Sequence, residues 1–137
     1  MIARITDQPL DLQFHVKHAS GPRAGAVATF VGLVRDHDPS VDGEVVGLEY
    51  SAHPDATAVL ERIAGQVAAS DEVLGLAVSH RIGSLRVGEA AIVCAVASAH
   101  RAAAFAACQL LVETVKSELP VWKRELLADG THHWVGL

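Results

Sequence analysis

The sequence lacks most of the short motifs that mark a common functional class. It has no P-loop, no GxGxxG fingerprint and no HExxH sequence, so the usual nucleotide-binding and zinc-hydrolase interpretations have no motif to support them. It has only two cysteines, and Cys94 and Cys108 are too far apart for a metal or redox pair motif. We expect both to be buried as small hydrophobic residues. The alternative is a thiol that carries a persulfide.

Long apolar runs are also absent. No stretch reaches the roughly 18 uninterrupted apolar residues of a membrane-spanning helix. The first nine residues, MIARITDQP, do not have the ordered charged, apolar and cleavage regions of a signal peptide. The formal net charge of −5 argues against a general nucleic-acid or membrane binder. We expect a cytoplasmic protein with neither partner.

Eight histidines are present, but none of them falls at the spacing of a zinc site. We therefore expect no metal and no cofactor. The alternative, a metal-assisted hydrolase that uses scattered histidines, is tested by elemental analysis of the purified chain.

The composition is that of a single folded unit. A chain of 137 residues suits one domain over residues 1–137. Half of the residues are hydrophobic and a fifth are charged, which allows a sizeable core. No repeat or low-complexity tract interrupts it, and the longest loop signal spans residues 36–43.

Residue patterning predicts helices and strands in mixed order. Asp11 is a possible N-cap for a short helix near residues 11–20. Apolar residues at helical spacing predict helices near residues 54–70 and 98–119, the last ended by Pro120. The third helix is expected to bury a stripe that includes Phe105. The predicted strands cover residues 2–6, 24–34, 44–51, 73–82, 89–97, 121–127 and 132–135.

The arrangement expected for these strands is a largely antiparallel sheet. Strands outnumber helices and several are linked as hairpins, so the predicted class is α+β. Segment 24–34 is expected to be a central strand with 44–51 as its partner, and residues 83–88 are expected to be a connection.

The most informative segment reads KSELPVWKRE and runs from Lys116 to Glu125. Lys116 lies eleven residues, nearly three helical turns, after Phe105, so its stem is expected to pack while its amine reaches a cleft or an interface. After Pro120 the side-chain period changes to two, which puts Lys123 and Glu125 on one face of a strand.

The two lysines of this segment can meet across the turn. A neighbouring cation makes it easier for Lys116 or Lys123 to lose its proton, and such a lysine can act as general acid, base or nucleophile. Glu125 can orient or neutralise Lys123. The alternative is a snorkelling lysine together with a surface ion pair of little energetic value.

Three further cationic residues are candidates for binding an anion. His100 and Arg101 begin the third helix, where a free cation opposes the helix dipole unless it shares an anion with the exposed amides. Arg35 ends a strand before a Gly/Asp/Pro loop. The alternative for each is a solvated side chain.

Four segments in this order resemble the large, catalytic subunit of molybdopterin synthase. They are TFVGLVR at 29–35, HRIG at 80–83, SAHR at 98–101, and Lys116 followed seven residues later by WKRE at 122–125. The resemblance covers most of the chain from about residue 25 to 135. It implies an α/β hammerhead-type fold with an additional small β subdomain. Leu33 stands where some family members carry lysine.

The resemblance also implies a function. It implies a sulfur transferase of molybdenum cofactor biosynthesis that converts cyclic pyranopterin monophosphate into molybdopterin. The implied sulfur source is the C-terminal Gly-Gly thiocarboxylate of a small ubiquitin-like subunit, and the implied assembly is a heterotetramer with a homodimer of this chain at its centre. The alternative is a non-catalytic binding module of the same fold that holds a partner's C-terminal tail or a small anion.

Residue roles carry over from the family position by position. The resemblance implies that Lys116 and Lys123 are catalytic. The residues that it implies for substrate binding are Arg35, His100, Arg101, Arg124 and Glu125.

These residues do not fit into one site on a single chain. Arg101 and Lys116 are fifteen residues apart on one helix, so about 22 Å separates their Cα atoms. A small pterin phosphate cannot touch both from a single helix. We therefore predict a composite site at a dimer interface, with the cations at 35, 116 and 123 from one subunit and those at 100 and 101 from its mate.

Overall fold

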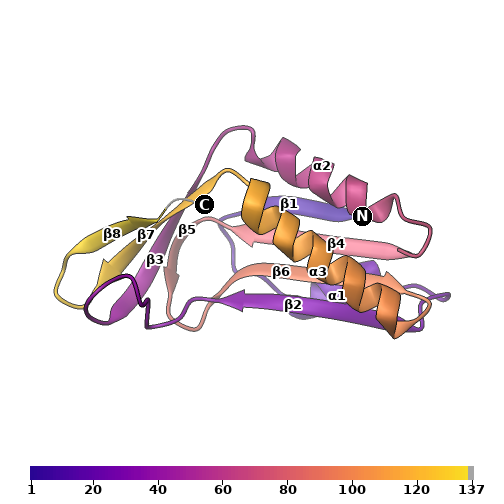
Figure 1. The fold of residues 1–137 in the computed structure, drawn as a ribbon, viewed down its shortest axis with the longest axis horizontal. Helices are drawn as coiled ribbons and strands as arrows, with labels where there is room; N and C mark the ends of the chain where they lie inside the picture. Colours follow the sequence, from indigo (N-terminus) through magenta and orange to yellow (C-terminus); the bar gives the residue numbers. More distant parts are fainter. Residues whose placement is uncertain (136–137) are drawn as a thin grey trace.

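The computed structural model of the chain describes residues 1–135. In this range the chain forms three helices and eight strands, and the strands are arranged in two four-stranded sheets (Figure 1). The elements in chain order are β1 (Ile2–Thr6), α1 (Leu12–Ala19), β2 (Ala26–Leu33), β3 (Val45–Ala52), α2 (Ala56–Ala68), β4 (Gly75–Arg81), β5 (Gly83–Arg86), β6 (Ala90–Ser98), α3 (Arg101–Glu118), β7 (Val121–Leu127) and β8 (His132–Val135).

The two sheets are almost entirely antiparallel. The larger has the order β1-β4-β6-β2 and the smaller β5-β3-β7-β8, and β1 with β4 is the parallel pair among the described strands. Figure 1 shows α2 and α3 over one face of the larger sheet, α1 behind it, and the smaller sheet projecting from one end. The α+β class, the antiparallel pairing and the additional small β unit are confirmed.

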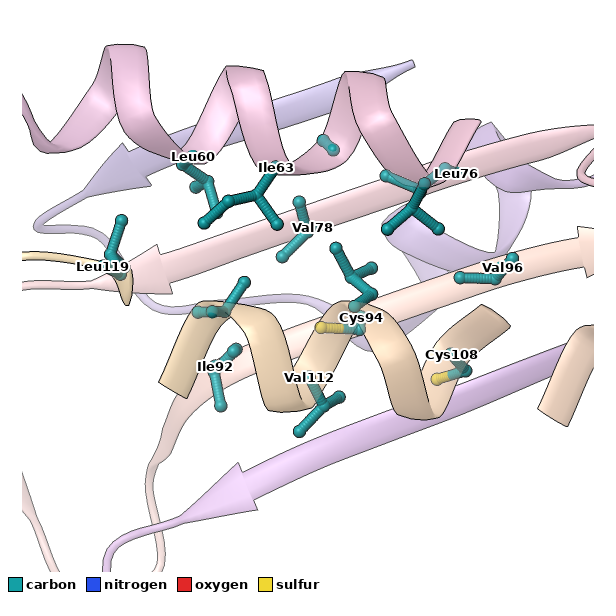
Figure 2. Close-up of a cluster of buried hydrophobic side chains, with 14 of the residues drawn as sticks. Leu60, Ile63, Leu76, Val78, Ile92, Cys94, Val96, Cys108, Val112 and Leu119 are labelled. Carbon is teal, nitrogen blue, oxygen red and sulfur yellow. The ribbon is translucent and has the colours of Figure 1, made fainter. Parts of the chain in front are cut away.

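The main core lies between α2, α3 and the larger sheet. Leu60 and Ile63 of α2 meet Val78, Cys94 and the buried stripe of α3, as Figure 2 shows. Almost every residue of β6 is buried, because α1 covers the opposite face of the sheet. These contacts fix the direction of α3, whose two ends carry three of the residues predicted to be functional, His100 and Arg101 at one end and Lys116 at the other.

The prediction that Phe105 belongs to the buried stripe of α3 is wrong. The buried positions are Ala104, Cys108, Leu111, Val112 and Val115. Phe105 is 67% exposed. One residue advances about 100° around a helix, so Phe105 follows buried Ala104 around the helix and faces outward beside β2.

Two predictions about strand pairing are also wrong. The strand β2 pairs only with β6 among the described strands and lies at the edge of its sheet, whereas β3 belongs to the other sheet. The connecting residues 34–44 exceed the length of an ordinary hairpin loop, and they carry the chain from one sheet to the other. Residues 83–86, expected to be a connection, form β5 against β3.

The junction of α1 with β4 leaves no room for a side chain at Gly75. A Cβ atom there would overlap the backbone carbonyl of Ala19, whereas a Cβ atom at Gly65 in α2 would meet nothing within 4 Å. We expect Gly75→Ala to lower the free energy of unfolding by about 1–3 kcal/mol and Gly65→Ala to raise it by about 0.5–1 kcal/mol. Urea unfolding of both variants measures this difference; equal effects at the two sites would contradict it.

Candidate active site

A cavity of about 260 Å³ lies where the two sheets meet the end of α3. We call it the junction pocket. Its wall includes the ends of β2 and α3, the inner faces of β3 and β7, and the loop that follows β2. The polar and charged side chains that line it are Arg35, Asp38, Tyr50, His80, Lys116, Lys123 and Glu125.

The two lysines reach the junction pocket from different elements. Lys116 lies in the last turn of α3, where its charge is favourable because the helix C-terminus is the negative end of the dipole. Lys123 lies on β7, directly opposite Tyr50 of β3. The turn at buried Leu119 and Pro120 connects the two elements, so a short stretch of chain supplies both amines.

Glu125 and Arg35, which are also candidate site residues predicted from the sequence, line the same pocket as the two lysines. Glu125 is 3% exposed and lies opposite Leu48 in the β3–β7 ladder. Arg35 follows the end of β2 and is exposed at the mouth of the pocket. The structure therefore brings Arg35, Lys116, Lys123 and Glu125 to one cavity.

Arg124 lies on the opposite face of β7 and does not line this cavity. Its guanidinium forms a 2.8 Å ion pair with Glu49 and lies 5.6 Å from the centre of the Trp134 ring. This follows from the alternation of side chains along a strand. These contacts indicate that Arg124 stabilises the outer face of the smaller sheet.

His100 and Arg101 lie at the other end of α3 from the junction pocket. His100 is the N-cap residue, its side chain makes no capping hydrogen bond, and both residues are exposed. The intact helix from Arg101 to Glu118 keeps this pair about 22 Å from Lys116 along its axis. A single chain therefore does not bring the His-Arg pair to the lysines.

His80 is a pocket residue to which the sequence assigned no role. It is 7% exposed, its Nδ1 donates to the backbone carbonyl of Arg81 at 2.8 Å, and its ring packs edge-on against Tyr50. Burial lowers the pKa of His80, and nearby Lys116 lowers it further. Both effects favour the neutral imidazole, in which donation by Nδ1 leaves Nε2 as the acceptor.

Tyr50 and Asp38 were also missed, although each had a weak signal. Tyr50 is the only tyrosine in the chain, and burial raises the pKa of its hydroxyl. Asp38 lies in the loop predicted at residues 36–43. Tyr50 lies opposite Lys123 in the β3–β7 ladder. Tyr50 could have been identified from the sequence only by pairing β3 with β7.

The two cysteines lie in the main core, as predicted. Figure 2 shows Cys94 on β6 and Cys108 on α3 among aliphatic side chains, and both thiols are free. Burial raises the pKa of both thiols. Because the thiolate is the nucleophile in sulfur exchange, these positions favour the packing role over a persulfide carrier.

Residues 1–135 lack two features that mark other classes of protein. No group of three or more histidine, cysteine, aspartate or glutamate side chains in this range is placed to hold a metal ion. No helix in the same range combines the length and apolar character needed to cross a membrane.

Comparison with known proteins gives consistent matches. Residues 5–118 match the family of MoaE proteins. A molybdopterin synthase catalytic subunit 1 from Mycobacterium tuberculosis is 40% identical over 134 residues, which cover 97% of this chain and 89% of the relative. The crystal structure of molybdopterin synthase from Staphylococcus aureus superposes with a TM-score of 0.89 at 28% identity, covering 98% of this chain and 97% of that one.

A more distant solved structure shares the fold. It is a complex of subunits 1 and 2 of the molybdopterin-converting factor from Helicobacter pylori, with a TM-score of 0.77 at 22% identity, and the match covers 96% of this chain and 88% of that one.

The fold and these matches define the class of the protein, which is an enzyme of molybdenum cofactor biosynthesis. More narrowly, the chain belongs to the MoaE protein family, whose relatives are named molybdopterin synthase catalytic subunits.

Proposed function

We propose that this chain transfers sulfur from the C-terminal thiocarboxylate of a small ubiquitin-like subunit to cyclic pyranopterin monophosphate, which yields molybdopterin. The observation that carries the proposal is the junction pocket, where two of the chain's three lysines meet beside Arg35. Both substrates are anions, and a pocket with clustered cations stabilises charge that develops during acyl and sulfur transfer. Residues 1–137 act as one catalytic domain in the cytoplasm.

The two lysines have different roles in this proposal. Lys123 lies deeper, on the inner face of β7 beside Glu125, and transfers a proton when the thiocarboxylate sulfur attacks the substrate. Lys116 is more exposed and positions the thiocarboxylate terminus or the acyl intermediate. Arg35 binds the phosphate at the mouth of the pocket.

A second copy of the chain supplies His100 and Arg101. The strand β2 runs in the same direction as α3. Its first residue, Ala26, pairs with Ser98 next to the start of α3, and its last residues, Gly32 and Leu33, line the junction pocket at the end of α3. Antiparallel pairing of two β2 edges therefore places the start of one α3 beside the pocket of the other copy. Exposed Phe105 and Leu33 supply apolar area along this edge.

The small sulfur-carrier subunit is the other partner. The Helicobacter pylori relative was solved as a complex of two different subunits, and we infer the same kind of pairing here, within a heterotetramer that has the homodimer at its centre. A flexible tail that ends in a carboxylate derivative enters a groove through backbone hydrogen bonds and capture of its terminus. The junction pocket is the cavity proposed to receive that terminus.

One assay tests the proposed reaction. The purified chain is incubated with cyclic pyranopterin monophosphate and a thiocarboxylated small subunit, and molybdopterin is measured; the matched control uses the same subunit with an ordinary carboxylate. We expect product only with the thiocarboxylate. A folded chain that binds the small subunit but forms no product would favour the non-catalytic binding module instead.

A further inference from the structure

The junction pocket holds two carboxyl groups in contact as well as its cations. Asp38 reaches the pocket from the loop between β2 and β3, and Glu125 reaches it from β7. The two carboxyl groups lie within hydrogen-bonding reach of each other. Two ionised carboxylates at such a separation repel strongly, so a close pair of this kind holds one proton between them.

The surroundings of Glu125 favour its protonated form. The residue is almost fully buried, and its Oε1 atom is enclosed without a hydrogen-bond partner among the described residues. An ionised oxygen in that position would have lost its water without gaining a donor, which costs free energy. Burial raises the pKa of Glu125, and Asp38 raises it further.

The surroundings of Asp38 favour its ionised form. Its Oδ1 accepts hydrogen bonds from the backbone N–H and the hydroxyl of Ser40, at 2.9 and 2.8 Å. The hydrogen bond with Glu125 holds the pKa of Asp38 well below its usual range, and the two bonds from Ser40 add to this effect. Together these surroundings favour the protonated form of Glu125, with its hydrogen bond made to ionised Asp38.

Other titratable groups act on Glu125 as well. Lys123 on the same strand and His133 on β8 both favour its ionised form, so they oppose burial and Asp38. The remaining titratable or charged side chains around the pocket, from the other elements that form its wall, are Arg35, Tyr50, His80 and Lys116.

We propose that Asp38 is a positioning residue which, by sharing a proton with Glu125, keeps Glu125 neutral, so that the cations of the junction pocket stay available to the anion that enters it. The anion's identity rests on the proposed sulfur transfer, but the shared proton does not. The family resemblance assigned no role to Asp38, and it assigned Glu125 only to substrate binding.

The shared proton sets the charge of the pocket. While Glu125 is neutral, three cationic side chains face one carboxylate, which leaves a surplus of two positive charges. This surplus matches a singly charged phosphate diester together with a singly charged thiocarboxylate. Ionisation of Glu125 halves the surplus, so anion affinity falls as pH rises through its pKa.

Infrared spectroscopy of the free chain tests the shared proton directly. With glutamate labelled at the side-chain carboxyl carbon, we expect one protonated-carboxyl band that persists to higher pH than the bands of the exposed glutamates. Glu125→Gln should abolish the band, and Asp38→Asn should lower its titration midpoint by about one pH unit or more. Asp36→Asn, an exposed position on the same loop, is the matched control and should change neither.

Sulfate binding tests the consequence for anions, because the charge of sulfate is constant in this pH range. Measured by calorimetry, its affinity for the wild-type chain should fall roughly fivefold or more as pH rises through the titration seen in the infrared. Glu125→Gln should remove this decrease, and Asp38→Asn should move it to lower pH. The proposal would be overturned if no band in the wild type persisted to higher pH than those of the exposed glutamates, or if Asp38→Asn left the midpoint unchanged. Either result would leave the proposed sulfur transfer untouched, because both experiments use the chain without the small subunit and measure no product.

Discussion

Replacing Lys123 with alanine is expected to lower the rate of molybdopterin formation by about 10²- to 10⁴-fold, the range that a positioned acid or base contributes. The side chain extends from β7 into the junction pocket and belongs to none of the three buried hydrophobic clusters. Its removal should therefore leave the fold and the binding of the small subunit unchanged. A single-turnover assay with thiocarboxylated small subunit measures the chemical step, and thermal unfolding verifies the fold.

Two variants make this result specific. Lys17→Ala removes the third lysine of the chain, which is exposed in the last turn of α1, and should keep the rate within about twofold. Lys123→Arg keeps the positive charge but cannot release a proton near neutral pH, so it should remain as slow as the alanine variant. If Lys123→Arg recovers the rate, the side chain acts only as a cation; if Lys123→Ala keeps the full rate, the catalytic assignment is wrong.

The geometry around Lys123 was largely predictable because it depends on local rules. Pro120 follows a long helical pattern, and a proline in the interior of such a pattern breaks or kinks the helix. The side-chain period of a strand places Lys123 and Glu125 on the same face regardless of the strand's neighbours. For the same reason Arg124 had to point to the other face, where it pairs with Glu49.

The parts that sequence patterning missed depend on contacts between distant segments. The apolar, β-branched sequence of β2 is equally compatible with a central or an edge position, and only the pairing with β6 decides. Asp38 faces Glu125 because the loop after β2 crosses between the sheets. His80 and Lys116 come together because the end of β4 and the last turn of α3 both line the junction pocket. No local spacing encodes either contact.

The edge position of β2 bears on how the site is completed. A central strand would have had both edges paired within its own sheet, whereas the observed β2 leaves one edge unpaired among the described strands. An unpaired edge beside exposed Phe105 is available for a second copy. The corrected position of this strand therefore supports the composite site more directly than the predicted one did.

Mixing two inactive variants should restore activity if the site is composite. Lys116→Ala and Arg101→Ala homodimers each lose one component from both of their sites and are expected to be strongly impaired. A heterodimer of the two concentrates both losses in one site and leaves the other intact. Equal mixing with full exchange gives half heterodimers, each with one working site, so about a quarter of wild-type activity is expected.

The pair Lys116→Ala and Lys123→Ala provides the matched control. Both lysines line the pocket of their own chain, so each site in that heterodimer lacks one of them and no activity should return. Different affinity tags on the two chains allow the heterodimers to be purified before the assay. Recovery in the control mixture, or no recovery in purified heterodimers of Lys116→Ala with Arg101→Ala, would contradict a site in which His100 and Arg101 come from the second subunit.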